Sequence, residues 1–264
     1  MPFAKLPDAQ LFYQWDGPEN APILVFSNSL GTTHRMWEPQ VQALSKHFRL
    51  LRYDTRGHGQ SSVTPGPYTI EKLATDVSHL LDALKIERAC FCGLSMGGMI
   101  GMLLGSTAAQ RFHKIVLCNT GAKIGTPDVW NARITAVQQG GLKAVAAGVL
   151  DRWLTANYRA AHPAETSQVL AMLEGTDPAG YTACCGAVRD MDYRAQLHRI
   201  QIPTLVIAGA HDPSTPPADG RFLADHIRGA KFVELSSAHL SNIEASEHFN
   251  REILAFLQSQ GAHG

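Results

Sequence analysis

A Gly-Leu-Ser-Met-Gly turn at positions 93–97 limits the folds open to this chain. Residues 89–93 before it are apolar and read as a strand, and residues 96–106 after it read as a helix. So sharp a turn strains its central residue and brings neighbouring segments close, which explains glycine at both of its ends. The pattern predicts that Ser95 stands at the carboxyl end of a strand, with the positive end of the next helix beneath it.

Short apolar strands alternate with helical segments along most of the chain. Besides 89–93, the predicted strands are apolar runs bounded by turn residues, at positions 11–15, 23–26, 48–53, 114–118, 204–208 and 231–235. Residues 73–84 carry leucine and valine at helical spacing with Thr69 as N-cap, and residues 243–258 read as a closing helix. This alternation predicts an α/β fold, in which helices cover both faces of a mostly parallel sheet.

The middle of the chain departs from this alternation. Residues 122–198 contain helical stretches separated by glycine and proline, without an obvious strand. Because sheet elements precede and follow this segment, we expect it to be inserted into a single core. The predicted core comprises residues 1–121 and 199–264, and residues 122–198 form a helical cap over the carboxyl edge of the sheet.

The overall charge and composition argue against several kinds of partner. Lysine plus arginine equals aspartate plus glutamate at 23 each, so nothing favours nucleic acid or an anionic membrane surface. The N-terminus lacks the apolar core of a signal peptide and no apolar run would span a bilayer, so we expect a cytoplasmic protein. Five cysteines, an odd number, favour free buried thiols over disulfides. The oligomeric state stays open.

The turn at 93–97 is typical of one that presents a nucleophile, so Ser95 is the predicted nucleophile. A serine hydroxyl is weakly nucleophilic and needs a base and a group that orients the base. In a sheet of this kind the nucleophile, acid and histidine follow one another along the chain, each after a strand. Asp212 follows the strand at 204–208 and His239 follows the strand at 231–235, so both satisfy the rule. Asp219 and Asp225 are rival acids, but they fall in the helical stretch beyond the strand end.

Both assignments have plainer alternatives. Asp212 lies in a proline-containing turn, where an aspartate often only caps the turn, and His239 reads equally as an ordinary loop histidine. Of the other histidines, His58 is interpreted as a structural turn residue without a chemical role. His34 is interpreted as a surface residue.

The oxyanion of an acyl-transfer reaction needs two hydrogen-bond donors. One is expected from the backbone N–H of Met96, directly after the nucleophile, and the other from the loop after an early strand. That loop covers residues 27–31, and Leu30 is expected to supply the second N–H.

A metal-assisted alternative needs clustered ligands such as His-x-His-x-Asp-His, and the chain has no such cluster, so no metal is expected.

Together these segments resemble the α/β-hydrolase superfamily over nearly the whole chain. The matching segments are residues 28–31, 54–61, 93–97 and 209–213 together with His239. Many members of the superfamily carry His-Gly where this chain has Asn28-Ser29. Residues 26–32, 93–99 and 238–244 resemble, more narrowly, the 3-oxoadipate enol-lactonase family of the β-ketoadipate pathway of aromatic degradation.

This resemblance implies hydrolysis of an enol-lactone through an acyl-enzyme on Ser95, without a cofactor. The implied partner is a small lactone that bears a carboxylate, so the pocket should hold a cation or polar donors. Among the arginines and tryptophans of residues 122–198, we select Arg133 and Trp153 as substrate-binding residues. Solvated or core positions are the alternative for each. Competing functions are another serine carboxylesterase, a C–C bond hydrolase of the same fold, or a non-catalytic binding protein.

Overall fold

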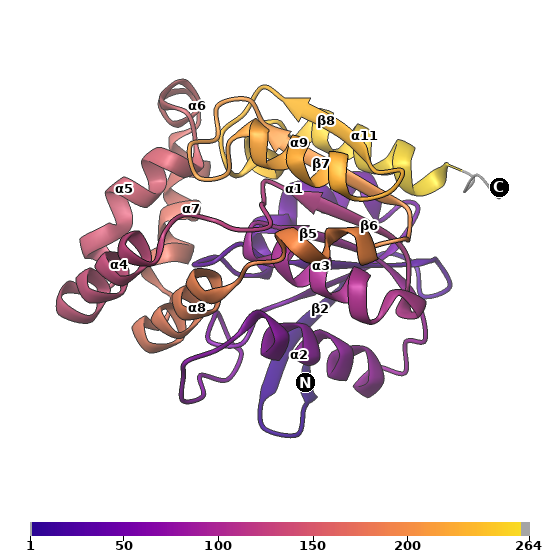
Figure 1. Ribbon diagram of the computed structural model, residues 1–264, viewed down its shortest axis with the longest axis horizontal. Helices are drawn as coiled ribbons and strands as arrows, with labels where there is room; N and C mark the ends of the chain where they lie inside the picture. Colours follow the sequence, from indigo (N-terminus) through magenta and orange to yellow (C-terminus); the bar gives the residue numbers. More distant parts are fainter. Residues whose placement is uncertain (1, 260–264) are drawn as a thin grey trace.

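One eight-stranded sheet organises the protein, and the computed structural model describes residues 2–259 (Figure 1). The strands are β1 (Phe3–Lys5), β2 (Gln10–Asp16), β3 (Ile23–Ser27), β4 (Arg49–Tyr53), β5 (Ala89–Leu94), β6 (Phe112–Cys118), β7 (Thr204–Gly209) and β8 (Lys231–Leu235). Their order is β1-β2-β4-β3-β5-β6-β7-β8, and only β1 and β2 run antiparallel to their neighbours. The predicted α/β fold with a mostly parallel sheet is confirmed. Strand β1 is an addition that the sequence pattern did not indicate.

Helices cover both faces of this sheet. The helices are α1 (Glu38–Leu44), α2 (Ile70–Ala83), α3 (Met96–Thr107), α4 (Pro127–Gly140), α5 (Lys143–Trp153), α6 (Ala156–Ala161), α7 (Pro163–Glu174), α8 (Pro178–Asp190), α9 (Pro217–His226), α10 (Ser241–Glu244) and α11 (Ser246–Gln258). Short 3-10 turns lie at His34–Trp37, Ala109–Arg111 and Arg194–Arg199.

The faces follow from the alternation of side chains along the strands. Phe91 of β5 is in register with Val25 of β3, whereas Phe26 is in register with Cys92 and points to the opposite face. A Cβ on Gly101 of α3 would meet Phe91, so α3 covers the first face. Phe26 stacks on Trp37, which in turn lies against a phenylalanine of α11, so α11 covers the second face.

Two helix boundaries test the sequence prediction. Thr69 caps α2 as expected, because its side chain accepts a hydrogen bond from the Lys72 N–H. The single closing helix predicted for 243–258 is wrong. Two helices, α10 and α11, meet there at Ala245, which has a non-helical backbone. Glu244, the last residue of α10, directs its carboxylate to the Ala238 N–H, and this contact accompanies the change of direction.

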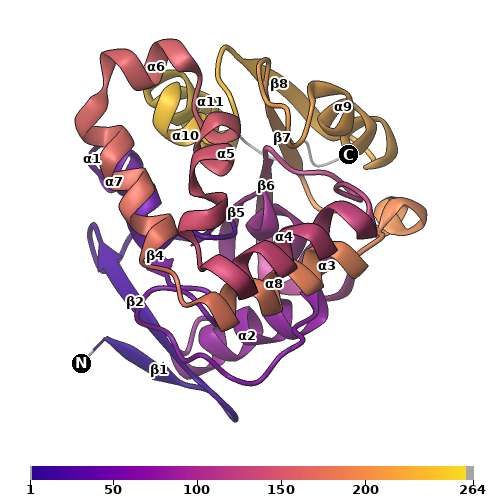
Figure 2. The same ribbon diagram turned by 90° about the vertical axis from the view of Figure 1, so that its left-hand side faces the viewer.

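Five helices, α4 to α8, lie between β6 and β7 in sequence and group on one side of the molecule. They stand at the left of Figure 1 and face the viewer in Figure 2. Helix α4 packs against α5 and α8, and α7 packs against α5 and α6. The boundaries of the predicted cap, residues 122–198, remain a proposal. None of the helices within residues 2–259 is long and apolar enough to cross a membrane.

Candidate active site

The turn between β5 and α3 holds Ser95 in a strained backbone conformation. Its φ of 57° and ψ of −114° are backbone angles that residues other than glycine rarely adopt. A Cβ on Gly93 would lie 2.1 Å from the Gly97 carbonyl oxygen, and one on Gly97 would lie 2.1 Å from the Ser27 carbonyl oxygen. Both contacts are with backbone, so neither position tolerates a side chain. Glycine at 93 and 97 is therefore required by close packing, as the sequence argument anticipated.

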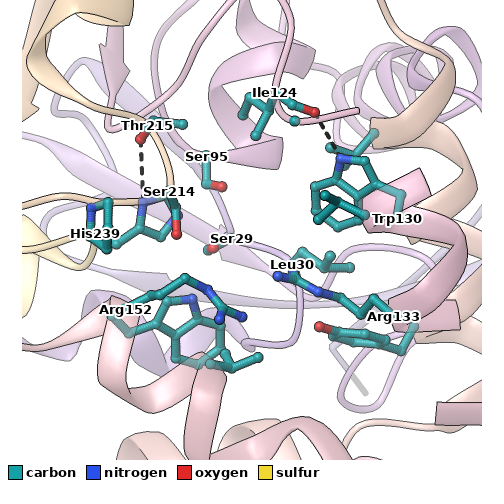
Figure 3. Close-up of a pocket in the computed structure, with 17 residues that line it drawn as sticks. Ser29, Leu30, Ser95, Ile124, Trp130, Arg133, Arg152, Ser214, Thr215 and His239 are labelled. Carbon is teal, nitrogen blue, oxygen red and sulfur yellow. Dashed lines mark hydrogen bonds between the residues drawn. The ribbon is translucent and has the colours of Figure 1, made fainter. Parts of the chain in front are cut away.

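Asp212 and His239 meet beyond the ends of β7 and β8. His239 Nδ1 lies 2.7 Å from Asp212 Oδ2, and both side chains are buried. A carboxylate oxygen only accepts, so Nδ1 carries the proton and Nε2 keeps its lone pair. Ser95 and His239 line the same cavity (Figure 3), which places the hydroxyl and the imidazole at one site.

The Asp212 carboxylate is surrounded by donors. Oδ1 accepts the backbone N–H groups of Ser214 and Thr215 at 2.8 and 3.1 Å. Besides His239, Oδ2 accepts the Thr215 hydroxyl at 2.6 Å and the Asn119 amide at 3.1 Å. Burial raises the pKa of Asp212, but the charge of His239 and these hydrogen bonds outweigh it, so the pKa is below its ordinary value. Asp212 is therefore ionised at neutral pH.

The rival acids occupy different positions. Asp219 lies in α9, where burial, and after it the negative charge of Asp212, raise its pKa. Asp225 lies further along the same helix. Within the described chain, Asp212 is the carboxylate that bonds to His239, and neither rival does.

Two backbone N–H groups next to Ser95 or its cavity, those of Leu30 and Met96, have no acceptor among residues 2–259. The N–H groups beside Leu30 are engaged: Ser29 N–H donates to Met36 Sδ at 3.3 Å and Gly31 N–H donates to His58 Nε2 at 2.9 Å. For Leu30 itself no acceptor is found within the described residues. The loop containing Leu30 lines the cavity together with Ser95.

The backbone around Met96 shows the same pattern: the N–H groups before and after Met96 are engaged, and its own is not. The Ser95 N–H donates to the Cys118 carbonyl at 2.9 Å and the Gly97 N–H donates to the Asn28 carbonyl at 3.0 Å. The described part of the chain offers no acceptor to the Met96 N–H between them. The Gly97–Asn28 bond also ties the two donor segments together.

Asn28 occupies the position where many superfamily members have histidine, and here it is structural. Its amide donates to the Tyr53 carbonyl at 2.7 Å, and its oxygen accepts the Trp37 indole N–H at 2.9 Å. These bonds anchor the start of the loop in the core. The departure from His-Gly is thus accommodated without moving the loop away from Ser95.

A cavity of about 240 Å³ opens above Ser95 (Figure 3). Its lining is mainly apolar and aromatic, with Trp130, Trp153 and Tyr181 among the walls. Both Arg133, on α4, and Arg152, on α5, line it, and no aspartate or glutamate does among residues 2–259. Burial, and then the charge of Arg133, lower the pKa of Arg152, so the two cations lie close enough to repel.

The structure therefore brings Arg133 and Trp153 to the cavity, together with residues that the sequence analysis did not select. Arg152 and Trp130 belong to the arginines and tryptophans of residues 122–198 but not to the predicted pair, and Tyr181 lies outside that group. The Arg133 guanidinium carbon lies 4.6 Å from the centre of the Trp130 ring, which holds the guanidinium in place. Helical periodicity within residues 122–198 carries no signal that separates such positions from solvated ones.

His34 and His58 are both buried. The prediction that His34 is a surface residue is wrong: it is buried, and its Nδ1 lies 2.8 Å from Asp54 Oδ1. His58 is also buried and contacts the loop of Leu30.

All five cysteines are free and buried. Within the described residues, no group of three or more His, Cys, Asp or Glu side chains is arranged to hold a metal ion.

Comparison with known proteins gives the class to which this fold and site correspond. A family model described as alpha/beta hydrolase fold matches residues 22–146. The chain is 45% identical to 3-oxoadipate enol-lactonase 1 of Acinetobacter baylyi over 249 residues, which cover 94% of this chain and 93% of that protein. The chain belongs to the α/β-hydrolase family.

Within that family it is similar to enol-lactonases. It is 42% identical to 3-oxoadipate enol-lactonase 2 of Acinetobacter baylyi, over 95% of this chain and 94% of the relative. The crystal structure of the enol-lactonase from Burkholderia xenovorans LB400 superposes with a TM-score of 0.97 and 48% identity, covering 98% of this chain and 100% of that one.

Proposed function

We propose that this protein hydrolyses 3-oxoadipate enol-lactone to 3-oxoadipate, in aromatic compound catabolism, through the triad Ser95, His239 and Asp212. The observation that carries the proposal is the convergence of three strand ends on one cavity. Ser95 and His239 line that cavity, and Asp212, which is not part of the lining, hydrogen-bonds to His239. The identity to 3-oxoadipate enol-lactonases over most of the chain supports the choice of substrate.

In the first half of the reaction Ser95 becomes acylated. Its Oγ attacks the lactone carbonyl while His239 Nε2 takes the hydroxyl proton, and ionised Asp212 stabilises the imidazolium. The N–H groups of Leu30 and Met96 stabilise the oxyanion. When the ring C–O bond breaks, the enolate leaves and receives the proton from His239. The resulting enol tautomerises to a ketone, which makes ring opening hard to reverse.

In the second half water replaces the enol. His239 removes a proton from water, and the oxygen attacks the ester carbonyl of the acyl-enzyme. The second tetrahedral intermediate collapses with cleavage of the Ser95 Oγ–acyl bond, and His239 returns the proton to Oγ. The product then carries two carboxylates. No step requires a metal or an organic cofactor.

The substrate carboxylate is assigned to the arginine side of the cavity. Arg133 and Arg152 present two guanidinium groups to a cavity whose described lining has no carboxylate. Trp153 forms an aromatic wall beside them. An anionic group entering here would relieve the repulsion between the two cations as well as form charge-assisted hydrogen bonds. A neutral ester lacks both contributions.

Residues 122–198 act in this proposal as the cap that supplies these groups, and residues 1–121 and 199–264 as the α/β-hydrolase core. We further propose that the protein works in the cytoplasm on its small-molecule substrate, without nucleic acid or membrane.

The decisive experiment compares three substrates: the enol-lactone, a saturated lactone with the same carboxylate arm, and a neutral aryl ester. We expect kcat/KM for the enol-lactone to be far above that for the aryl ester, and unaffected by a chelator. Comparable or reversed values would replace the enol-lactonase proposal by a general carboxylesterase. Ser95→Ala should abolish turnover of all three while the protein stays folded and still binds product. Turnover that survives in this variant would show that Ser95 is not the nucleophile.

The arginine assignment has its own test. Arg133→Met and Arg152→Met should each raise KM for the enol-lactone about 10- to 100-fold, the effect of one charged hydrogen bond, and leave the aryl ester nearly unchanged. Arg194→Met is the matched control, because Arg194 pairs with Asp192 on the surface. Equal effects on charged and neutral substrates would contradict the assignment.

A further inference from the structure

We infer that His58 is a positioning residue for the oxyanion donor Leu30, acting through a hydrogen bond to the adjacent Gly31 N–H. The inference rests on the proposed function, because it concerns the oxyanion loop of that mechanism. His58 comes from the turn after β4, within the Asp54–Ser61 segment, and is 27 residues away from Gly31 in sequence. Its Nε2 accepts the Gly31 N–H at 2.9 Å.

This contact fixes both the tautomer and the charge of His58. A backbone N–H only donates, so Nε2 must present its lone pair to Gly31. The proton therefore sits on Nδ1, which lies 3.3 Å from the Arg56 carbonyl oxygen, an acceptor. One neutral tautomer alone satisfies both contacts. Burial lowers the pKa of His58, against the weaker opposing effects of the Arg56 carbonyl and the Asp54 carboxylate, and so keeps the ring neutral.

The loop around Leu30 is held from both sides. The peptide that carries the Leu30 N–H has the Ser29 carbonyl at its other end, and this oxygen accepts the Thr32 N–H at 3.2 Å and the Thr32 hydroxyl at 2.8 Å. The next peptide ends in the Gly31 N–H, which is held by His58. Both peptide planes that meet at the Leu30 Cα are thus fixed, and His58 supplies the only side-chain acceptor for the second among the described residues.

Among residues 2–259, His58 Nε2 is the one acceptor that the Gly31 N–H reaches. Gly31 is buried, with a φ of +79°, and a Cβ on it would lie 2.7 Å from Leu173 Cδ1, so the cap packs directly on it. A buried N–H that loses its acceptor is strongly unfavourable, so the peptide would rotate towards another partner. That rotation changes the backbone torsion at Leu30, and the neighbouring peptide, which carries the Leu30 N–H, readjusts away from the oxyanion position.

His58 is itself mounted on a rigid base. Arg56, two residues before it, is fully buried and pairs with Asp76 through contacts of 2.6 and 2.7 Å and with Asp8 at 2.8 Å. These ion pairs fix the segment whose carbonyl orients the His58 ring. Among the residues described, His58 is not part of the cavity lining, so its effect on the reaction is indirect.

Two amide substitutions separate positioning from general packing. In His58→Gln the side-chain oxygen reaches the place of Nε2 and can accept the Gly31 N–H, whereas in His58→Asn it reaches only the place of Nδ1. We expect His58→Asn to lower kcat about 10- to 100-fold with KM within about twofold, below the 10²–10³ loss for complete removal of one oxyanion donor. His58→Gln should stay within about fivefold of the wild type, because it restores the acceptor.

The readouts are kcat and KM for both the enol-lactone and an aryl ester, the rate at which a fluorophosphonate modifies Ser95, and the melting temperature. The phosphoryl oxygen of the reagent needs the same donors, so its reaction should slow in parallel with kcat in His58→Asn. Wild-type kcat in folded His58→Asn, or equal losses in both folded variants, would overturn the inference. A loss confined to KM would overturn it too.

His58→Leu extends the comparison to a side chain with no polar atom. It should match His58→Asn, and a folded His58→Leu with wild-type fluorophosphonate reactivity would also refute the role. If the enol-lactone proves not to be the substrate, the aryl ester and the fluorophosphonate still decide the question. Failure of the proposed function and failure of this inference are therefore distinguishable.

Discussion

Replacing Asp212 by asparagine is the sharpest probe of the proposed triad, because the surroundings dictate how the amide must sit. The backbone N–H groups of Ser214 and Thr215 cannot turn away, so the amide oxygen has to replace the carboxylate oxygen that they contact. The amide nitrogen then faces His239 Nδ1, which lies 2.7 Å from the other oxygen in the wild type. A donor now meets the protonated Nδ1.

The imidazole resolves this conflict by moving its proton to Nε2. Nδ1 then accepts the amide N–H, and Nε2 no longer has a lone pair for the Ser95 proton. The variant loses the general base and the stabilisation of the imidazolium while its packing is nearly unchanged. We expect kcat to fall about 10⁴-fold, or about 5 kcal/mol in the activation free energy, as in a serine protease with the same substitution. KM should change by less than about threefold, because substrate contacts are untouched.

The assay is steady-state hydrolysis of the enol-lactone at saturating concentration, with the active-site concentration checked by folded-protein content and melting temperature. Asp219→Asn is the matched control, because Asp219 is also partly buried on α9 near Asp212 yet does not bond to His239 in the described chain. Its kcat should stay within about twofold. A loss smaller than tenfold in folded Asp212→Asn, or a larger loss in Asp219→Asn, would refute the reasoning.

Three further predictions follow from local geometry. Gly31→Ala should lower the free energy of unfolding by at least about 1–2 kcal/mol in guanidinium titration, because its φ is +79° and a Cβ would meet Leu173. Ser241→Ala should lower kcat several-fold with KM unchanged, since the Ser241 hydroxyl donates at 2.5 Å to Asn119, which orients Asp212. A wild-type kcat in Ser241→Ala would contradict this role of Ser241 in holding Asn119. Because the folded pKa of His58 lies below its unfolded value of about 6.5, the unfolded state binds more protons in acid, and stability should fall as the pH drops below about 6.5. Calorimetry of the wild type against His58→Gln should show a smaller fall in the variant.

Those features that depend on strand ends were predictable from the sequence. Apolar strands, a glycine-flanked serine, and an acid and a histidine after later strands leave few arrangements in a parallel sheet. The order of the three residues therefore indicated that Ser95, Asp212 and His239 would lie near one another. The bond between Asp212 and His239 and the shared cavity agree with that expectation.

Features that depend on side-chain partners were not predictable in the same way. His34 reads as a surface residue because nothing local indicates that Asp54, 20 residues later, accepts its Nδ1. The break at Ala245 depends on the contact of Glu244 with Ala238 rather than on helical propensity. Arg152 resembles other arginines in residues 122–198 until the cavity that it lines is known. In each case the deciding contact is distant in sequence.

Hydrogen bonds join residues 122–198, the proposed cap, to the segment around His239, and in our proposal they give the substrate carboxylate a role beyond affinity. The Leu240 N–H, directly after His239, donates to the Trp153 carbonyl at 2.9 Å, and Trp153 directly follows Arg152 in α5. Glu244 adds a second link, because its carboxylate accepts the Thr155 N–H at 3.2 Å and the Ala238 N–H at 2.9 Å. The end of α5, which binds the substrate carboxylate in our proposal, is thus hydrogen-bonded to the segment that carries the His239 imidazole. Binding energy gained at Arg152 is then available to align the lactone carbonyl with the base, and lowers the activation barrier as well as KM.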